Sequence, residues 1–213
     1  MKDYIENSLS KLWSEYQNEY GDIPIFNRKY VFAIPRKSDI LITGINPSNN
    51  GKPKHSFSFD EADYRYFTKL KKIAPNATYL DLFYIRGMQN ELNEFTNNSM
   101  GIRFLADQLK LTQELIEEIV KPKLILVFNK GSWGYWGYYK DIIWMGYEFQ
   151  FEKELEFGKL MRITGLKKHP ERISSNITKT NLENTLVYFS KYLNYTSNEE
   201  IAKIKEEIEQ FKY

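Results

Sequence analysis

The chain has 213 residues and a formal net charge of +2 at pH 7, with 42% hydrophobic and 27% charged residues. This is an ordinary globular composition, and the length fits one domain, which we expect to span residues 1–213. The near-neutral charge excludes a protein that is basic throughout, so any surface that binds nucleic acid must be local. The aromatic share of 16% is high, and composition leaves open whether these rings fill the core or stack on bases.

Cysteine is absent from the chain and only two histidines are present. The first fact excludes disulfides and cysteine-ligated zinc or iron–sulfur sites, and the second argues against a histidine-based metal site. We therefore expect no metal and no cofactor. The N-terminus, MKDYIENSLSKLW, has no apolar signal region, and no apolar run is long enough to cross a membrane. The expectation is a soluble, cytoplasmic monomer.

The spacing of apolar residues predicts the elements of secondary structure in chain order. Helical spacing over residues 3–20 ends at Gly21 and Pro24. The strands predicted after it cover residues 30–34, 39–43, 79–84, 123–128 and 160–164. The further helices predicted cover residues 61–73, 101–120, 181–193 and 197–211, the last within a C-terminal helical segment, 195–213.

Short apolar strands that alternate with helices are typical of an α/β fold whose mostly parallel sheet is covered on both faces. We expect a three-layer α/β/α arrangement around a central four-stranded sheet. The four strands are those at residues 39–43, 79–84, 123–128 and 160–164. Because ligands of such sheets bind beyond the carboxyl ends of the strands, the segments that follow the strands are the candidates for a functional site.

The segment LITGINP, residues 41–47, joins a predicted strand to a loop. Gly44 allows the backbone to turn sharply, and Pro47 stiffens the loop. The amide of Asn46 can hold a water molecule through both its donor and its acceptor. The segment resembles the first motif of uracil-DNA glycosylases, closest to the Gly-Ile-Asn-Pro-Gly form of the mismatch-specific branch. Taken alone, strand–Gly–x–Asn–Pro also describes an ordinary strand end.

The segment LKKHPERISSN, residues 166–176, follows the last predicted strand. It is similar to the second motif of the same superfamily, His-Pro-Ser-Pro followed by a wedge residue. His169 and Pro170 match that motif, and the two residues after them depart from it. Ile173 stands where the family places the side chain that enters the duplex.

Further matches follow the family's order along the chain. Residues 123–131 resemble the third core strand with its glycine turn, and residues 79–84 resemble the strand that carries the base-reading residue. Phe57 and Phe59 follow the first motif at about the distance of the family's stacking aromatic. Because their spacing alternates, we expect one of them to stack on a base and the other to pack in the core.

The resemblance implies a monofunctional DNA glycosylase that hydrolyses the N-glycosidic bond of uracil or a related damaged base. Such an enzyme turns the target base out of the DNA and recognises it in a pocket. The DNA substrate is either duplex or single-stranded. Asn46 would position the attacking water, and His169 would donate a hydrogen bond to the base carbonyl. The strand ends before Asn46 and His169 should therefore lie at the same end of the sheet. The base-binding residues would be Ile45, Phe57, Phe59 and Asp81. The DNA-binding residues would be Ser48, Lys168, Arg172, Ile173, Ser174, Ser175 and Asn176.

Asp81 departs from the best-known branch of the family, which has Asn there, and Ser48 replaces the usual Gly or Tyr. Strand alternation places Asp81 on the same face as Tyr79. An acid on an apolar strand either forms a salt bridge or a helix cap, or it reads a base. An ionised carboxylate only accepts hydrogen bonds and so favours a base with an amino group, whereas a protonated one restores uracil reading.

Several interpretations stay open at the level of sequence. Lys167, Lys168 and Arg172 are either solvated charges or phosphate contacts. The aromatic cluster at residues 133–139 either packs in a core or interface, or stacks on bases. Two functions compete with the glycosylase: a catalytically weak relative that binds nucleic acid without cleaving it, and an α/β domain that binds a small nucleotide-like ligand.

Overall fold

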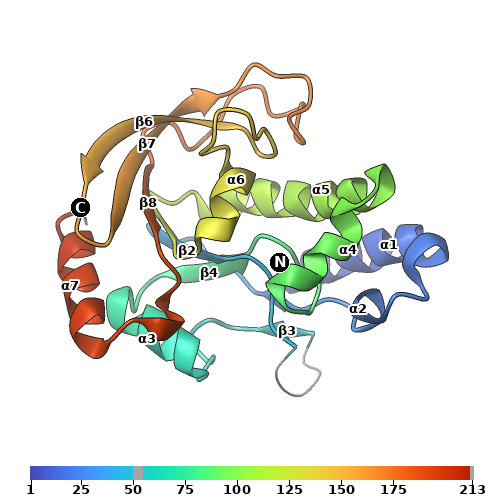
Figure 1. Ribbon diagram of the computed structural model, residues 1–213, viewed down its shortest axis with the longest axis horizontal. Helices are drawn as coiled ribbons and strands as arrows, with labels where there is room; N and C mark the ends of the chain where they lie inside the picture. The colour runs from blue at the N-terminus through green and yellow to red at the C-terminus, as the bar shows by residue number, and fades with distance from the viewer. Residues whose placement is uncertain (50–54, 212–213) are drawn as a thin grey trace.

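The computed structural model describes residues 1–49 and 55–211 and has an α/β fold (Figure 1). The strands of this described part are β1 (Phe32–Ala33), β2 (Ile40–Gly44), β3 (Ser56–Phe57), β4 (Thr78–Asp81), β5 (Leu124–Val127), β6 (Tyr147–Glu154), β7 (Gly158–Leu166) and β8 (Leu186–Ser190). Its α-helices are α1 (Lys2–Tyr20), α2 (Pro24–Asn27), α3 (Arg65–Ile73), α4 (Asn93–Thr96), α5 (Ser99–Glu114), α6 (Trp133–Trp136) and α7 (Asn198–Glu209). Short 3₁₀ turns are η1 (Gln89–Leu92), η3 (Lys130–Ser132) and η4 (Leu193–Tyr195), and η2 (Leu115–Val120) continues α5 as a π-helix.

Within the described residues the main sheet is mixed and has six strands, in the order β4-β2-β5-β8-β7-β6. The first four of these strands run parallel to one another. β7 runs antiparallel to β8, and β6 runs antiparallel to β7. The register pairs Thr43 with Leu80 on one side and with Val127 on the other, so β2 is an interior strand of the parallel part.

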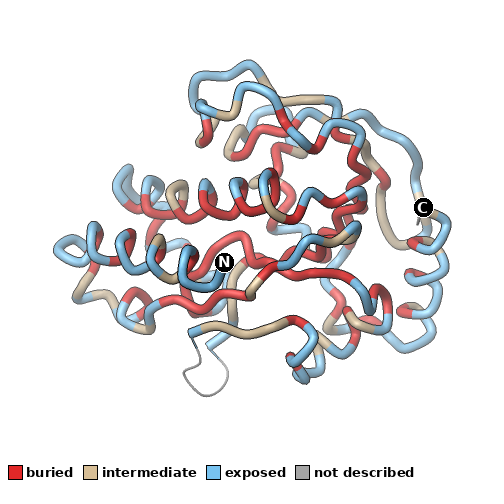
Figure 2. The backbone as a smooth tube through the Cα atoms, turned by 180° about the vertical axis from the view of Figure 1, so that it is seen from behind, coloured by how far each residue is buried: buried red, intermediate tan, exposed pale blue. Residues whose placement is uncertain are grey.

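Buried side chains alternate between two cores on the two faces of the sheet. In β2, Leu41 packs into the cluster that contains α1 and α5, and Ile42 packs into the cluster that contains α3 and α7. In β5, Ile125 and Leu126 divide in the same way. Figure 2 shows the consequence, with buried strands in the middle and helices exposed along their outer sides. The apolar runs of these strands follow from burial on both faces.

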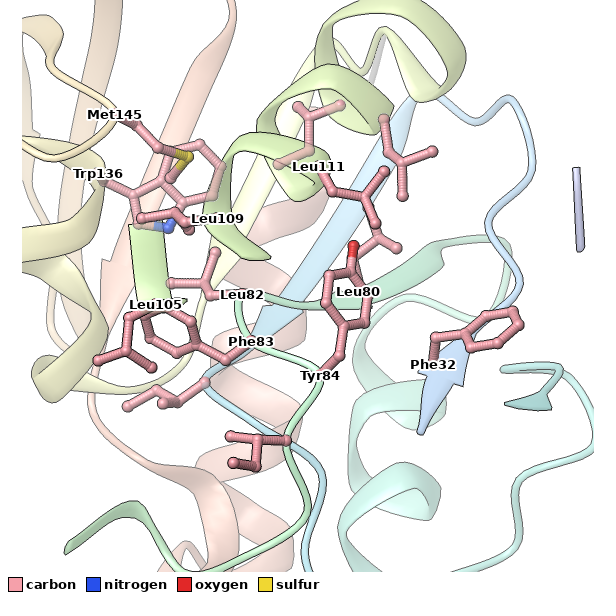
Figure 3. Packing of buried hydrophobic residues seen from close by; sticks show 14 of the residues in the cluster. Phe32, Leu80, Leu82, Phe83, Tyr84, Leu105, Leu109, Leu111, Trp136 and Met145 are labelled. Atoms are coloured by element: carbon pink, nitrogen blue, oxygen red, sulfur yellow. The ribbon is translucent and has the colours of Figure 1, made fainter. Parts of the chain in front are cut away.

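α5 covers one face because its apolar residues recur at helical spacing. Leu105 and Leu109, four residues apart, lie on the same side of the helix and point toward Leu82 and Phe83 (Figure 3). Each of these side chains is fully buried. Complete burial of such a side chain stabilises the fold by about 1.5–3 kcal/mol, so this contact holds α5 on the sheet and fixes the loop after β4.

The strand predicted at residues 160–164 exists, but its predicted direction is wrong. It lies in β7, which runs antiparallel to β8, with Gly158 opposite Ser190 and Arg162 opposite Leu186. The connection from β7 to β8, residues 167–185, contains no helix, whereas parallel neighbours are usually joined by a crossover helix. β6 was not predicted because its side chains are largely exposed and charged.

The helix predicted at residues 181–193 is also wrong, because this segment contains β8, the fourth parallel strand. All five residues of β8, LVYFS, are buried, and the strand pairs with β5. A short apolar run that is buried on both faces has no alternation and reads equally as a helix segment. The sheet therefore has its fourth parallel strand one element later in the chain than expected.

The C-terminal helix predicted within residues 195–213 is confirmed as α7. Its start is set by Ser197, which accepts from the backbone of Glu200 while the Glu200 carboxylate accepts from the backbone of Ser197. Ile201, Ile204 and Ile208 then face the sheet. None of the helices in the described ranges combines the length and apolar character needed to cross a membrane.

Candidate active site at the carboxyl ends of the parallel strands

A cleft lies at the carboxyl ends of β2, β4, β5 and β8 and is bordered by the start of α3. Its volume is about 1910 Å³, larger than the ~300–1,000 Å³ of a typical small-molecule pocket. The residues that line it include Asn46, Pro47 and Ser48 after β2, Asp81, Arg86 and Gly87 at and after β4, Asn129 after β5, Tyr192, Asn194 and Tyr195 after β8, and Tyr64, Arg65, Tyr66 and Phe67 at α3. The position is the one expected for a ligand site of a parallel α/β sheet.

Gly44 ends β2 beneath this cleft, paired with Asp81 of β4. We expected this glycine to supply a sharp turn, but its backbone is not in the left-handed region that favours glycine. A Cβ at this position would instead overlap the Tyr79 hydroxyl and the Asp81 carboxylate. Glycine is required because two buried side chains pack directly against its Cα.

Gly44→Ala should therefore destabilise the fold by about 1–3 kcal/mol, the usual range for forcing a methyl group into a packed core. Urea denaturation gives the free energy of unfolding. The matched control is Gly165→Ala in β7, whose added Cβ would lie 3.6 Å from the Glu148 carboxylate, an ordinary contact. Equal losses in the two variants would contradict the close-packing role of Gly44.

Asn46 is bound to the loop after β4 through its amide nitrogen. Nδ2 donates to the carbonyl oxygens of Gly87 at 2.8 Å and Ile85 at 3.3 Å. The backbone adds hydrogen bonds from Phe83 N to Ile45 O and from Gly87 N to Pro47 O. Within the described residues, Oδ1 of Asn46 has no hydrogen-bond partner, so it can accept a hydrogen from a water or a ligand. Ile45 itself is buried in the cleft wall.

Asp81 lies at the floor of the cleft and is only 3% exposed. Its Oδ1 accepts a hydrogen bond from the Tyr79 hydroxyl at 2.7 Å, as their common strand face predicted. Burial raises the pKa of Asp81 to about 7, against the opposing effect of the Tyr79 hydrogen bond. In the part of the chain that the structure describes, Asp81 forms neither a salt bridge nor a helix cap. Oδ2 is left to meet a ligand.

The two phenylalanines after the first motif divide between the cleft and the core. Phe57 is half-buried and lines the cleft. Phe59 is buried and stacks on Tyr79, with ring centroids 5.9 Å apart and planes 11° apart. Phe59 therefore has the packing role that we expected for one of the pair, and it does not line the cleft.

Sequence reasoning missed the loop after β8, because residues 181–193 had been predicted as a helix. The buried Lys69 of α3 holds this loop: its Nζ donates to the carbonyl oxygens of Leu193, Asn194 and Thr196 at 2.8–2.9 Å. The loop presents Tyr195, 94% exposed, at the rim of the cleft. The signal that was available is the run LVYFS, whose β-branched and aromatic residues favour a strand.

His169 lies near the amino ends of the parallel strands, whereas Asn46 lies at their carboxyl ends. The expectation that the two residues lie at the same end of the sheet is therefore wrong. β7 runs antiparallel to β8, and its residue Arg162 already pairs with Leu186, the first residue of β8. The loop after β7 therefore begins at the amino ends of the parallel strands. His169 is exposed there, and its Nδ1 accepts from the backbone of Glu171.

The residues expected to contact DNA beside His169 also lie in the loop after β7, near the amino ends of the parallel strands. Ile173 packs against the core instead of projecting as a wedge. Arg172 donates to the carbonyl oxygens of Ser174 and Ile177, which binds it within its own loop. Ser174 is buried, whereas Lys168, Ser175 and Asn176 are exposed. Of the expected DNA-binding residues, Ser48 lines the cleft.

The aromatic cluster at residues 133–139 is largely core. Trp133 and Trp136 are buried in the cluster that contains α5, and Tyr135 and Tyr138 pack against it. The packing interpretation is confirmed for these residues.

Compared with protein-family models and with curated proteins, the sequence gives no match.

Proposed function

We propose that this protein is a DNA glycosylase of the uracil-DNA glycosylase type and that the target base binds in the cleft at the carboxyl ends of β2, β4, β5 and β8. In this proposal the parallel strands form the centre of the family's three-layer arrangement, and the β6–β7 hairpin is an addition to it. One observation carries the proposal: Asn46 and Asp81 line the same cleft, and each has a side-chain oxygen without a hydrogen-bond partner among the described residues.

The reaction proposed is hydrolysis of the bond between the sugar and the base. A water molecule that donates a hydrogen bond to Asn46 Oδ1 forms the new bond to C1′ of the sugar. The bond from C1′ to the base nitrogen breaks, its electron pair leaves with the base, and the water releases a proton to solvent. Asn46 orients the water without removing its proton, since an amide is not a base at neutral pH.

Recognition of the base is assigned to the floor and walls of the cleft. Asp81 Oδ2 faces the edge of the base, and Phe57 and Tyr66 offer aromatic surfaces to its faces. The cleft is larger than one base requires, so it also has room for the attached sugar and phosphates.

A catalytically weak nucleic-acid-binding relative is the second candidate, and the position of His169 favours it. His169 was the expected donor to the base carbonyl, and it lies near the amino ends of the parallel strands, away from the cleft at their carboxyl ends. Without that donor, an oxyanion on the departing base loses one stabilising hydrogen bond, which is typically worth about 10²–10³ in rate. Such a protein would bind a base in the same cleft and release it unchanged.

Release of free base from oligonucleotides separates these functions. Single- and double-stranded oligonucleotides that carry uracil, hypoxanthine or a mispaired thymine are incubated with the protein, and abasic sites are detected as alkali-labile breaks. The proposal expects breaks at one or more of these bases. Salt-dependent DNA binding without breaks would favour the weak relative. Neither binding nor breaks would leave the small nucleotide-like ligand as the remaining function.

A further inference from the structure

Arg86 is a buried arginine of the cleft whose side chain has no partner among the described residues. It is 9% exposed and lies in the loop after β4. Its Nε is buried without a hydrogen-bond partner, and among the described residues its guanidinium forms no ion pair and no cation–π contact. Burying an unpaired charge is costly, so a group in this state points to an anion that is bound during function.

The backbone holds Arg86 next to the proposed water site. Asn46 donates to the carbonyl oxygens of Ile85 and Gly87, the residues on either side of Arg86. The backbone N–H of Arg86 donates to Lys29 O at 3.4 Å. Arg86 is therefore placed by the same contacts that place Asn46, and its charge belongs to the same cleft.

Four acids line the cleft, Glu61, Asp63, Asp81 and Glu91, and in the described structure none of them forms an ion pair with Arg86. Glu91 forms an ion pair with Arg28 at 2.9 Å and also accepts from Met88 N at 2.6 Å. Asp81 accepts from Tyr79 and forms no ion pair. Arg28 is thus a neutralised arginine and Arg86 is an unneutralised one, although both line the same cleft.

We propose that Arg86 binds a phosphate oxygen of the nucleic-acid strand whose base occupies the cleft. The planar guanidinium presents paired N–H donors that match phosphate oxygens. A neutral base and sugar supply no anion, so the phosphodiester beside them is the chemical group that fits. This inference rests on the proposed function for its ligand, and it adds a binding residue that the first motif does not contain.

The experiment compares trinucleotides that have natural phosphodiester linkages with trinucleotides of the same sequence that have neutral methylphosphonate linkages. Each carries uracil at the centre, and equilibrium binding is measured at one salt concentration. The parent protein should bind the phosphodiester form roughly ten- to a hundredfold more tightly, the usual contribution of a charged hydrogen-bond donor. Arg86→Gln should bind both forms equally. Arg172→Gln, at the opposite edge, should keep the preference of the parent.

A measurement on the free protein tests whether the Arg86→Gln variant is still correctly folded. Because Arg86→Gln removes an unpaired buried charge, the thermal unfolding midpoint of the free variant should equal or exceed that of the parent. A lower midpoint would mean that Arg86 holds the fold together, and would overturn the proposal. So would a preference for phosphodiester that persists in Arg86→Gln, or a parent that binds neither trinucleotide.

The outcomes also separate this inference from the proposed function. If the phosphodiester preference depends on Arg86 but no base is ever released, the glycosylase proposal fails and the phosphate contact stands. If base is released and Arg86→Gln keeps the preference, the phosphate contact fails and the glycosylase proposal stands.

Discussion

Replacing Asn46 with alanine should lower the rate of base release by about 10²–10³-fold, the typical effect of removing one group that acts mainly in the transition state. The reason is the loss of Oδ1, the free acceptor for the attacking water. Binding of the oligonucleotide should survive, because Asp81 and the aromatic walls of the cleft remain. Single-turnover rates and equilibrium binding, measured on the same oligonucleotide, give the two quantities separately.

Two variants serve as controls for this result. His169→Ala should leave the rate close to that of the parent, because His169 lies at the opposite edge of the sheet. Asn46→Asp keeps an acceptor but removes the amide donor to Ile85 O and Gly87 O, so it reports on the anchoring of the loop. A large loss in His169→Ala together with none in Asn46→Ala would contradict the placement of the site.

Replacing Asp81 with asparagine should remove a large pH dependence of stability. Burial raises the pKa of Asp81 from its ordinary value of 3.8 to about 7 in the folded protein. Between these pH values the folded state keeps a proton that the unfolded state has released. The free energy of unfolding of the parent should therefore fall as the pH rises, by about 4 kcal/mol across the whole window, and become level above it.

The Asp81→Asn variant has no ionisable group at this position, so its stability should lack this fall. Near pH 4 the two proteins should be similarly stable, and near pH 8 the variant should be the more stable by up to about 4 kcal/mol. Urea denaturation at a series of pH values measures the difference, and all other titrating groups cancel in the comparison. A difference that is constant with pH would show that Asp81 titrates normally.

The same proton controls which base Asp81 can read. Tyr79 occupies Oδ1, so Oδ2 alone meets the ligand. An ionised Oδ2 accepts from an amino group and repels a carbonyl, whereas a protonated Oδ2 donates to the carbonyl of uracil. We therefore expect release of uracil by the parent to increase toward acid pH, and Asp81→Asn to release uracil faster than the parent at neutral pH. Fast release that is independent of both changes would make Asp81 structural.

Local pattern was sufficient to predict the centre of the fold. β2 and β5 are short apolar runs that end at glycine- or asparagine-containing turns, and both are buried parallel strands as expected. Alternation along β4 placed Tyr79 and Asp81 on one face, where they form a hydrogen bond. Each of these inferences depends on residues that are neighbours in sequence.

The position of His169 could not be predicted from local sequence, because it depends on the direction of the strand that precedes it. Residues 160–164 have the same apolar run whether they run parallel or antiparallel to β8. Their direction depends on the connection to β8, residues 167–185, which contains no crossover helix, and β8 itself was predicted as a helix. The sequence does contain His-Pro at residues 169–170, but this segment lies near the amino ends of the parallel strands and not at the carboxyl ends, where the cleft lies.

The contacts that shape the cleft were also beyond local pattern. Lys69 binds carbonyl oxygens 124–127 residues away in the chain, and any residue type supplies a carbonyl oxygen. The side chain of Arg86 has no partner within the described part of the chain, and this can be seen only once the chain is folded. Such groups give no periodicity and match no motif, so their roles become visible only after the strands are placed.

Photocrosslinking tests most directly whether the base binds in the cleft at the carboxyl ends of the parallel strands. A single-stranded oligonucleotide that carries 5-iodouracil at the target position is irradiated with the protein, and the crosslinked peptides are identified by mass spectrometry. We expect crosslinks to the cleft aromatics Phe57, Tyr66 and Tyr192. Crosslinks confined to residues 167–176, at the amino ends of the strands, would contradict the account.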